Sequence, residues 1–207
     1  METSNLISFI AVSMLLTLAP GPDILYVITQ SISAGKKAGI ATALGLCTGL
    51  IVHTTAAAFG VSQILLQSAI AFKILKYAGA IYLFYLAWQA FREKGSSLPG
   101  APPTVRKTSS LYKQGIYMNI LNPKVALFFL AFLPQFVGTS AGNVTGQMVL
   151  LGVLFILQAI IIFTLIATFA GIFGKRLTAN PRISKYINYA KGSVFILIGV
   201  KLALADM

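Results

Sequence analysis

The sequence LAPGPD at residues 18–23 interrupts an apolar run at about 5–31, and this interruption decides the fold. Pro20 and Pro22 lack the backbone N–H that an unbroken helix uses, and they clash with the preceding turn. Gly21 between them relaxes the backbone further. We therefore expect one long helix that is broken near its middle.

A second apolar run carries a matching break. It covers about 114–137 and contains LNPK at residues 121–124, so Pro123 interrupts it as Pro20 interrupts the first run. The first and the fourth helices of the chain are therefore both expected to be broken by proline.

The composition places the whole chain in a membrane. Hydrophobic residues make up 57% of the 207 residues and charged residues 10%, whereas a soluble domain carries about a quarter charged residues. Apolar runs long enough to cross a bilayer recur throughout. We predict an all-α integral membrane protein, with residues 1–207 as a single membrane transport domain. About six transmembrane helices are expected, at about 5–31, 38–67, 72–91, 114–137, 145–173 and 187–205.

The formal net charge of +12 follows membrane topology and forms no stripe for nucleic acid. Lys and Arg gather in the connections near 32–37, 92–113 and 174–186, whereas the connection at 138–144 has neither. Because cytoplasmic loops are rich in Lys and Arg, we expect both termini outside. A linker at 96–112 is expected to be cytoplasmic.

The two halves of the chain are similar to each other. Repeat one covers 1–95 and repeat two covers 113–207, and glycines recur at equal spacings after Pro20 and after Pro123. Each half has three predicted helices, so the halves insert in opposite directions. This pattern predicts an inverted repeat, an architecture typical of secondary transporters.

The two breaks carry the chemistry of a binding site. Irregular backbone at membrane depth is tolerated only where it faces protein or a watery cavity. A half-helix that begins at a break directs its positive dipole end at a carboxylate, and one that ends there offers carbonyls to an ammonium group. A zwitterionic amino acid satisfies both. The residues expected to serve substrate and transport are Pro20, Gly21, Pro22, Asp23, Asn122, Pro123 and Lys124.

Asp23 and Lys124 are the only charges well inside the predicted spans. Burying either one alone is costly, so they either form a salt bridge that holds the halves together or handle ions and substrate. Asp23 is the better candidate for proton coupling, because burial and a nearby cation favour opposite protonation states of a carboxylate. His53 is a second candidate, with a buried histidine on a backbone carbonyl as the alternative.

Four other residues have a structural interpretation. Asn122 either presents its amide to a substrate or caps the next half-helix. Gln158 either lines the path or bonds a neighbouring helix. Gly45 and Gly49 form a small-xxx-small pattern, which is typical of close helix contacts.

The motifs LAPGPD at 18–23 and NPK at 122–124 resemble those of the LysE/RhtB family of bacterial amino-acid exporters, as do GLCTG at 45–49 and KYAGAIYL at 76–83. The resemblance covers essentially the whole chain. It implies export across the bacterial plasma (inner) membrane, driven by the proton motive force and without a cofactor. It also assigns function to the residues of the two break motifs. The chain is more similar to the branch that exports neutral residues such as threonine, homoserine or leucine. The implied partners are an amino-acid substrate, protons and the lipid bilayer, with no nucleic acid.

The same residues also bear on other possible functions. Export of basic amino acids or of a divalent cation would use the same scaffold, but a divalent cation needs several oxygen ligands and Asp23 stands almost alone. A polytopic membrane enzyme is disfavoured, because one His, one Cys and one acid at mid-membrane depth assemble no metal cluster or catalytic triad. The sequence leaves open which amino acid is carried, the coupling stoichiometry and whether the chain forms a homo-oligomer.

Reporter fusions test the orientation. Reporters placed after about residues 100 and 180 should be cytoplasmic and one at about residue 141 should be external, because Lys and Arg are retained on the cytoplasmic side. Compartment-specific activity in intact cells measures each position. An external linker would overturn both the orientation and the assignment of the cytoplasmic side.

Overall fold

The computed structural model describes residues 3–19, 21–62, 68–92, 107–138, 142–177 and 181–204, without the side chains of 172–177, 181–188, 190 and 191. Every regular element in these ranges is a helix, which confirms the all-α class. The elements are α1 (Thr3–Leu18), α2 (Pro22–Ala34), α3 (Lys36–Thr55), the π-helix η1 (Ala56–Val61), α5 (Ala69–Arg92), α6 (Thr108–Ile120), α7 (Pro123–Leu127), the π-helix η2 (Phe128–Phe132), the 3-10 helix η3 (Leu133–Phe136), α8 (Val144–Leu177) and α9 (Pro181–Leu204).

Three straight helical segments are long and apolar enough to cross a bilayer: α3 with η1, α5, and the Val144–Gly171 part of α8. Two bent pairs each qualify as one span, α1 with α2 at a bend of 56°, and α6 with α7 to η3 at a bend of 49°. The breaks predicted in the first and fourth helices are therefore present. The sixth predicted span corresponds to α9, but its described apolar part, Gly192–Leu204, is shorter than a span requires, so the described residues contain at most five of the six predicted spans.

The helices extend further into polar sequence than predicted. α6 begins at Thr108, so the end of the linker predicted at 96–112 is helical, and residues 93–106 lie outside the described residues. α8 runs to Leu177, and α9 starts at Pro181, because proline fits the first turn of a helix. Apolar runs mark only the membrane-embedded part of a helix, which explains the difference.

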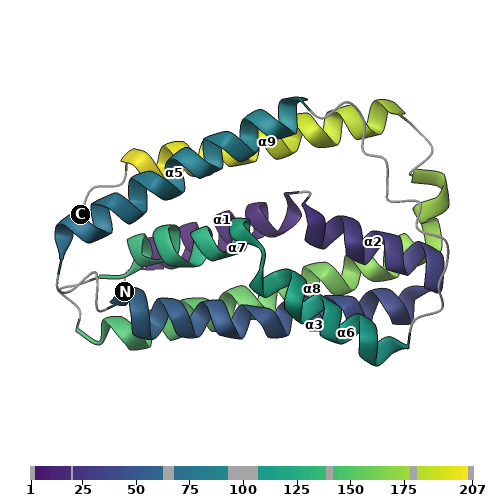
Figure 1. Cartoon of the computed structure of the whole chain (residues 1–207), viewed down its shortest axis with the longest axis horizontal. Helices are drawn as coiled ribbons and strands as arrows, with labels where there is room; N and C mark the ends of the chain where they lie inside the picture. Colours follow the sequence, from purple (N-terminus) through teal and green to yellow (C-terminus); the bar gives the residue numbers. More distant parts are fainter. Residues whose placement is uncertain are drawn as a thin grey trace.

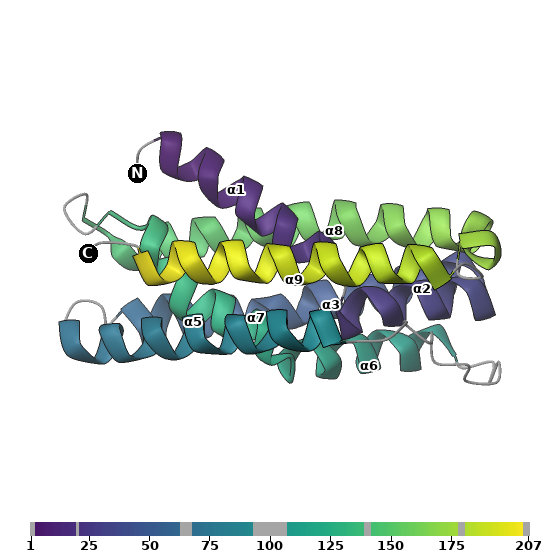
Figure 2. The same cartoon turned by 90° about the horizontal axis from the view of Figure 1, so that it is seen from above.

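The pairing of helices relates the two halves of the chain. α5 and α9, the third helices of the two halves, pack side by side along one flank (Figures 1 and 2). α3 and α8, the second helices, also pack on each other, and α1 contacts α8 as α6 contacts α3. These three contacts are of the kind that an inverted repeat predicts, whereas α2 packs extensively on both α3 and α8 and its counterpart α7 contacts α3 only slightly, so the inverted repeat stays a prediction. The repeat boundaries at 1–95 and 113–207 stay a prediction.

Glycines let α3 and α6 approach closely. A Cβ atom on Gly45 would clash with the backbone of Tyr112, and one on Gly115 would lie 2.5 Å from the Thr42 carbonyl oxygen. One turn further along α3, Gly49 lies against Asn119. The close contact predicted from the small-residue pattern is therefore present.

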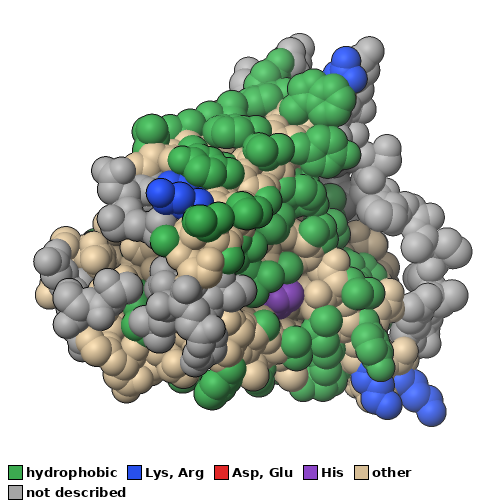
Figure 3. Space-filling model, turned by 60° about the vertical axis from the view of Figure 1, so that its left-hand side comes forward, with side chains coloured by type: hydrophobic (Ala, Val, Ile, Leu, Met, Phe, Trp, Pro, Cys, Tyr) green, Lys and Arg blue, Asp and Glu red, His purple; other side chains and the backbone are tan. Residues whose placement is uncertain are grey.

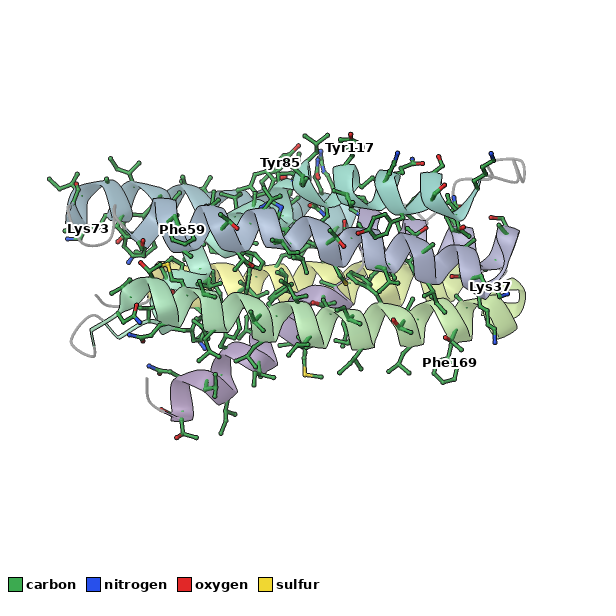
Figure 4. All side chains as sticks on the ribbon, turned by 90° about the horizontal axis from the view of Figure 1, so that it is seen from below. Lys37, Phe59, Lys73, Tyr85, Tyr117 and Phe169 are labelled. Atoms are coloured by element: carbon green, nitrogen blue, oxygen red, sulfur yellow. The ribbon has the colours of Figure 1, made fainter. Side chains whose placement is uncertain are left out.

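The outer surface carries many exposed apolar side chains. Ile70, Ile81 and Phe59 are 73%, 68% and 65% exposed, and one face shows a broad field of hydrophobic side chains (Figure 3). Lys37 and Lys73 lie toward opposite ends of the bundle (Figure 4). This distribution fits a hydrocarbon-facing band with cations near its borders.

Alanine substitutions test the glycine contact. Gly45→Ala should destabilise the protein by about 1–3 kcal/mol, because the added methyl group overpacks the α3–α6 contact. Gly60→Ala is the matched control, since a Cβ there meets nothing within 4 Å, and alanine favours a helix over glycine by roughly 0.5–1 kcal/mol. Thermal unfolding of the purified proteins in detergent measures both. Equal effects of the two changes would contradict the close approach of α3 and α6.

Candidate substrate-binding site

The helix breaks bring Asp23 and the segment around Asn122 together in the interior. α2 begins at Pro22, so Asp23 lies in its first turn, and Gly21 before it is extended with φ −148°. α7 begins at Pro123, and Asn122 is extended because a residue before proline avoids helical angles. Proline suits the first position of each half-helix, where no N–H donor is needed. Pro20, the remaining member of the predicted set in this helix, lies outside the described residues.

Asp23 and Lys124 form a buried ion pair between the two breaks. Lys124 Nζ lies 3.5 Å from Asp23 Oδ2, and the two side chains are 7% and 4% exposed. Gly21 leaves room for the ammonium group, since a Cβ there would lie 3.1 Å from Nζ. An ion without a partner is costly at this depth. Each charge therefore compensates the other, and the pair links the two halves.

Asn122 connects both members of the ion pair. Its Nδ2 donates a hydrogen bond to Asp23 Oδ1, and its Oδ1 accepts one from the backbone N–H of Lys124 at 3.0 Å. The same side chain is thus a cap of α7 and a ligand of Asp23. One N–H of the Asn122 amide and its oxygen are therefore engaged within the protein.

Polar side chains also cover two carbonyls at the breaks. Lys124 Nζ lies 3.4 Å from the Ala19 carbonyl oxygen, just beyond the end of α1. The Asn119 carbonyl would accept from residue 123 in an unbroken helix, but Pro123 has no N–H. That oxygen accepts instead from the backbone N–H of Asn122 at 2.9 Å, and His53 Nε2, which lies 3.0 Å away, donates a second hydrogen bond to it. In this structure His53 is therefore a buried histidine bonded to a backbone carbonyl, which is the alternative to proton coupling given above.

A small cavity lies beside the ion pair. Its polar lining comes from Thr17, Asp23, Asn119 and Lys124. Its free volume of about 10 Å³ holds roughly one water molecule. A whole amino acid does not fit, so this is a closed conformation. The apolar lining is Leu16, Leu50, Val125, Phe155 and Phe163.

Different packing closes the two sides of the cavity. Toward the end of the bundle where α1 begins, phenylalanine rings fill the space between α1, η2, η3 and α8. Phe9 packs on Phe128 and Phe136 with ring centroids 6.1 and 5.3 Å apart, and Phe128 packs on Phe155 at 5.3 Å. Toward the end where α6 begins, the glycine contacts between α3 and α6 bring backbones together. The two sides of the cavity are therefore packed in different ways.

The structure adds two residues that the sequence did not single out. Thr17 and Asn119 line the cavity, and Asn119 is 1% exposed. Each is a polar residue shortly before a proline, Thr17 before Pro20 and Asn119 before Pro123. This position next to a helix break is the signal from which the sequence could have identified them. Gln158 Nε2 donates to Thr17 Oγ1 at 2.9 Å, so Gln158 bonds a neighbouring helix next to the cavity. The described residues contain no group of three or more His, Cys, Asp or Glu that could hold a metal ion.

The comparison with protein families agrees with this architecture. A model of the LysE type translocator matches residues 14–206, which include both breaks and the ion pair. The chain belongs to the LysE-type translocator family. It is therefore a multi-pass membrane transporter.

Several similar proteins match almost the whole chain. The homoserine/homoserine lactone efflux protein of Salmonella typhimurium is 34% identical over 201 residues, which are 96% of this chain and 95% of the relative. An uncharacterized membrane protein of Bacillus subtilis is 30% identical over 212 residues, covering 97% and 99%. The leucine efflux protein of an Enterobacter species is 28% identical over 204 residues, covering 96% and 95%. No solved structure matches the chain.

A double-mutant cycle tests the ion pair. Lys124→Met should destabilise the translocator by about 3–5 kcal/mol, because Asp23 is left as a buried charge without its cation. Adding Asp23→Asn should recover most of that loss, since neither charge then remains. Thermal unfolding of the purified single and double variants measures the coupling. Additive effects of the two changes would mean that the pair contributes nothing to stability.

Proposed function

We propose that this LysE-type translocator exports small neutral amino acids from the cytoplasm across the bacterial plasma membrane, driven by the proton motive force. The observation that carries the proposal is the buried Asp23–Lys124 pair between two broken helices, beside a small cavity. The relatives named for homoserine and leucine efflux support the substrate class.

The substrate resembles the ion pair that it replaces. An amino acid carries an ammonium group and a carboxylate, so its ammonium group can take Asp23 while its carboxylate takes Lys124. Each buried charge then keeps a partner of opposite sign when the helices separate, and the cost of an unpaired ion is avoided. When the amino acid leaves, the two side chains pair again and the site closes.

The charge balance of the site favours neutral amino acids. Asp23 and Lys124 sum to zero, and a zwitterion with an uncharged side chain also sums to zero. A basic amino acid would bring one more cation, but the other acidic residues, Glu2, Glu93 and Asp206, lie outside the predicted spans. A divalent cation suffers from the same shortage of carboxylates. Basic amino acids and metal ions are therefore disfavoured as substrates.

Competition at Asp23 supplies the coupling. A carboxylate that accepts a proton no longer attracts the ammonium group of the substrate, so one site holds either a proton or an amino acid. Alternation between a protonated inward return and a substrate-loaded outward step makes the exchange obligatory. Asp23 is the candidate proton carrier, because it is the carboxylate in contact with both Asn122 and Lys124.

Transport in inside-out membrane vesicles tests the substrate class and the driving force. An acidic lumen corresponds to an acidic cell exterior, so it should drive accumulation of several neutral amino acids, including leucine and homoserine, in the lumen. A protonophore should abolish the accumulation, and vesicles without the translocator are the control. Flux that ignores the pH gradient would indicate a passive channel, and transport confined to a divalent metal would sink the amino-acid hypothesis.

Substitution of His53 separates the two proton candidates. His53→Gln keeps a donor for the Asn119 carbonyl but removes the titratable ring, so pH-driven accumulation should persist within about a factor of three of the unaltered protein, with any loss due to packing. The same vesicle assay, corrected for the amount of protein in the membrane, measures it. Loss of the response to the pH gradient with retained amino-acid exchange would move the proton from Asp23 to His53.

A further inference from the structure

Two buried acceptor atoms near the cavity have no hydrogen-bond donor among the residues that the structure describes. They are Asn119 Oδ1 and Gln158 Oε1. Asn119 lines the cavity directly. Gln158 is joined to the lining by its bond to Thr17 Oγ1, while the Thr17 hydroxyl donates to the Ser13 carbonyl at 2.9 Å. The polar wall formed by Thr17, Asn119 and Gln158 thus presents two acceptors, while the Gln158 amide and the Thr17 hydroxyl donate to other groups.

Buried acceptors of this kind are matched to a ligand that brings a donor. A polar group with no partner in a dry interior costs about 1–3 kcal/mol, and a hydrogen bond from a ligand removes that cost. A hydrocarbon group placed there leaves the cost in place. The wall therefore favours ligands that bring an N–H or O–H donor over ligands that place a hydrocarbon group there.

The ammonium and carboxylate groups of the substrate have other partners. In the proposed function, on which this inference rests, the ammonium group pairs with Asp23 and the carboxylate pairs with Lys124. Asn119 belongs to α6, before the second break, whereas Lys124 belongs to the half-helix after it. Thr17 and Gln158 approach from α1 and α8. The two acceptors therefore lie on helices other than those that carry Asp23 and Lys124.

We propose that Thr17, Asn119 and Gln158 form a side-chain subsite that selects amino acids with a hydroxyl or another N–H or O–H donor on a short apolar stem. Asn119 Oδ1 accepts from the substrate hydroxyl, and Gln158, fixed by Thr17, supplies the second acceptor. Apolar lining residues such as Leu50 and Val125 contact the methylene groups of the stem. Homoserine has this chemistry, and norvaline is its isostere with a methyl group in place of the hydroxyl.

Parallel export of homoserine and norvaline from the same vesicles tests the subsite. The unaltered protein should prefer homoserine by about tenfold in the ratio of initial rate to concentration, because only homoserine satisfies the acceptor. Asn119→Leu keeps the branched shape and the backbone carbonyl that His53 contacts. It should bring the ratio close to one while norvaline export persists. Gln158→Leu should shift the ratio in the same direction.

Norvaline export serves as the internal measure of folding, and Thr42→Val is the matched control. Thr42 is buried and bonds only within its own helix, to the Ala38 carbonyl at 3.0 Å, so its loss should leave the ratio unchanged. Equal losses for both amino acids in Asn119→Leu and Gln158→Leu, or an unchanged ratio, would overturn the subsite while export itself stands. Export of neither amino acid by the unaltered protein would instead remove the proposed function.

Discussion

The fold depends on satisfying the backbone groups that the prolines leave without helical partners inside a membrane. Lipid supplies no hydrogen bonds, so a carbonyl exposed by a helix break must find a donor within the protein. The Ala19 carbonyl accepts from Lys124, and the Asn119 carbonyl accepts from His53 in addition to the backbone N–H of Asn122, so each gains a side-chain donor from the other half of the chain. Because the donor for Ala19 is a cation, Asp23 is needed beside it, and Asn122 holds that carboxylate in place. One constraint therefore places four polar side chains together.

The same contacts explain how a site can be closed and still ready to open. Breaking the ion pair without a replacement would leave two buried charges, so the empty protein is held shut. A zwitterion replaces both partners and removes that barrier. The packing on either side is already different, with phenylalanine rings toward one end of the cavity and glycine-mediated helix contacts toward the other. Two distinct barriers around one central site are what alternating access requires.

Much of this site could be predicted from the sequence, because prolines and charges in apolar runs are strong local signals. Pro22 and Pro123 mark the breaks, because proline does not continue a helix. Asp23 and Lys124 are charges within apolar runs, and burial forces these two charges to pair. Asn119 could not be predicted in this way, since its position on the cavity depends on how α6 packs against α3 through Gly49. The contact between Lys124 Nζ and the Ala19 carbonyl oxygen likewise depends on tertiary packing. Helix ends were missed where a helix continues from apolar into polar sequence, as α6 does from Thr108.

The central claim is that Asp23 holds a proton or a substrate but never both, and Asp23→Asn tests it most directly. Asparagine keeps the size and hydrogen bonding of the side chain but cannot carry the proton. In vesicles matched for the amount of protein in the membrane, the account predicts that this variant exchanges labelled for unlabelled amino acid much more slowly than the unaltered protein, because asparagine, like a protonated Asp23, does not attract the ammonium group of the substrate. It also predicts that an imposed pH gradient no longer drives accumulation. Normal pH-driven accumulation by the Asp23→Asn protein would contradict the account and remove Asp23 from the coupling mechanism.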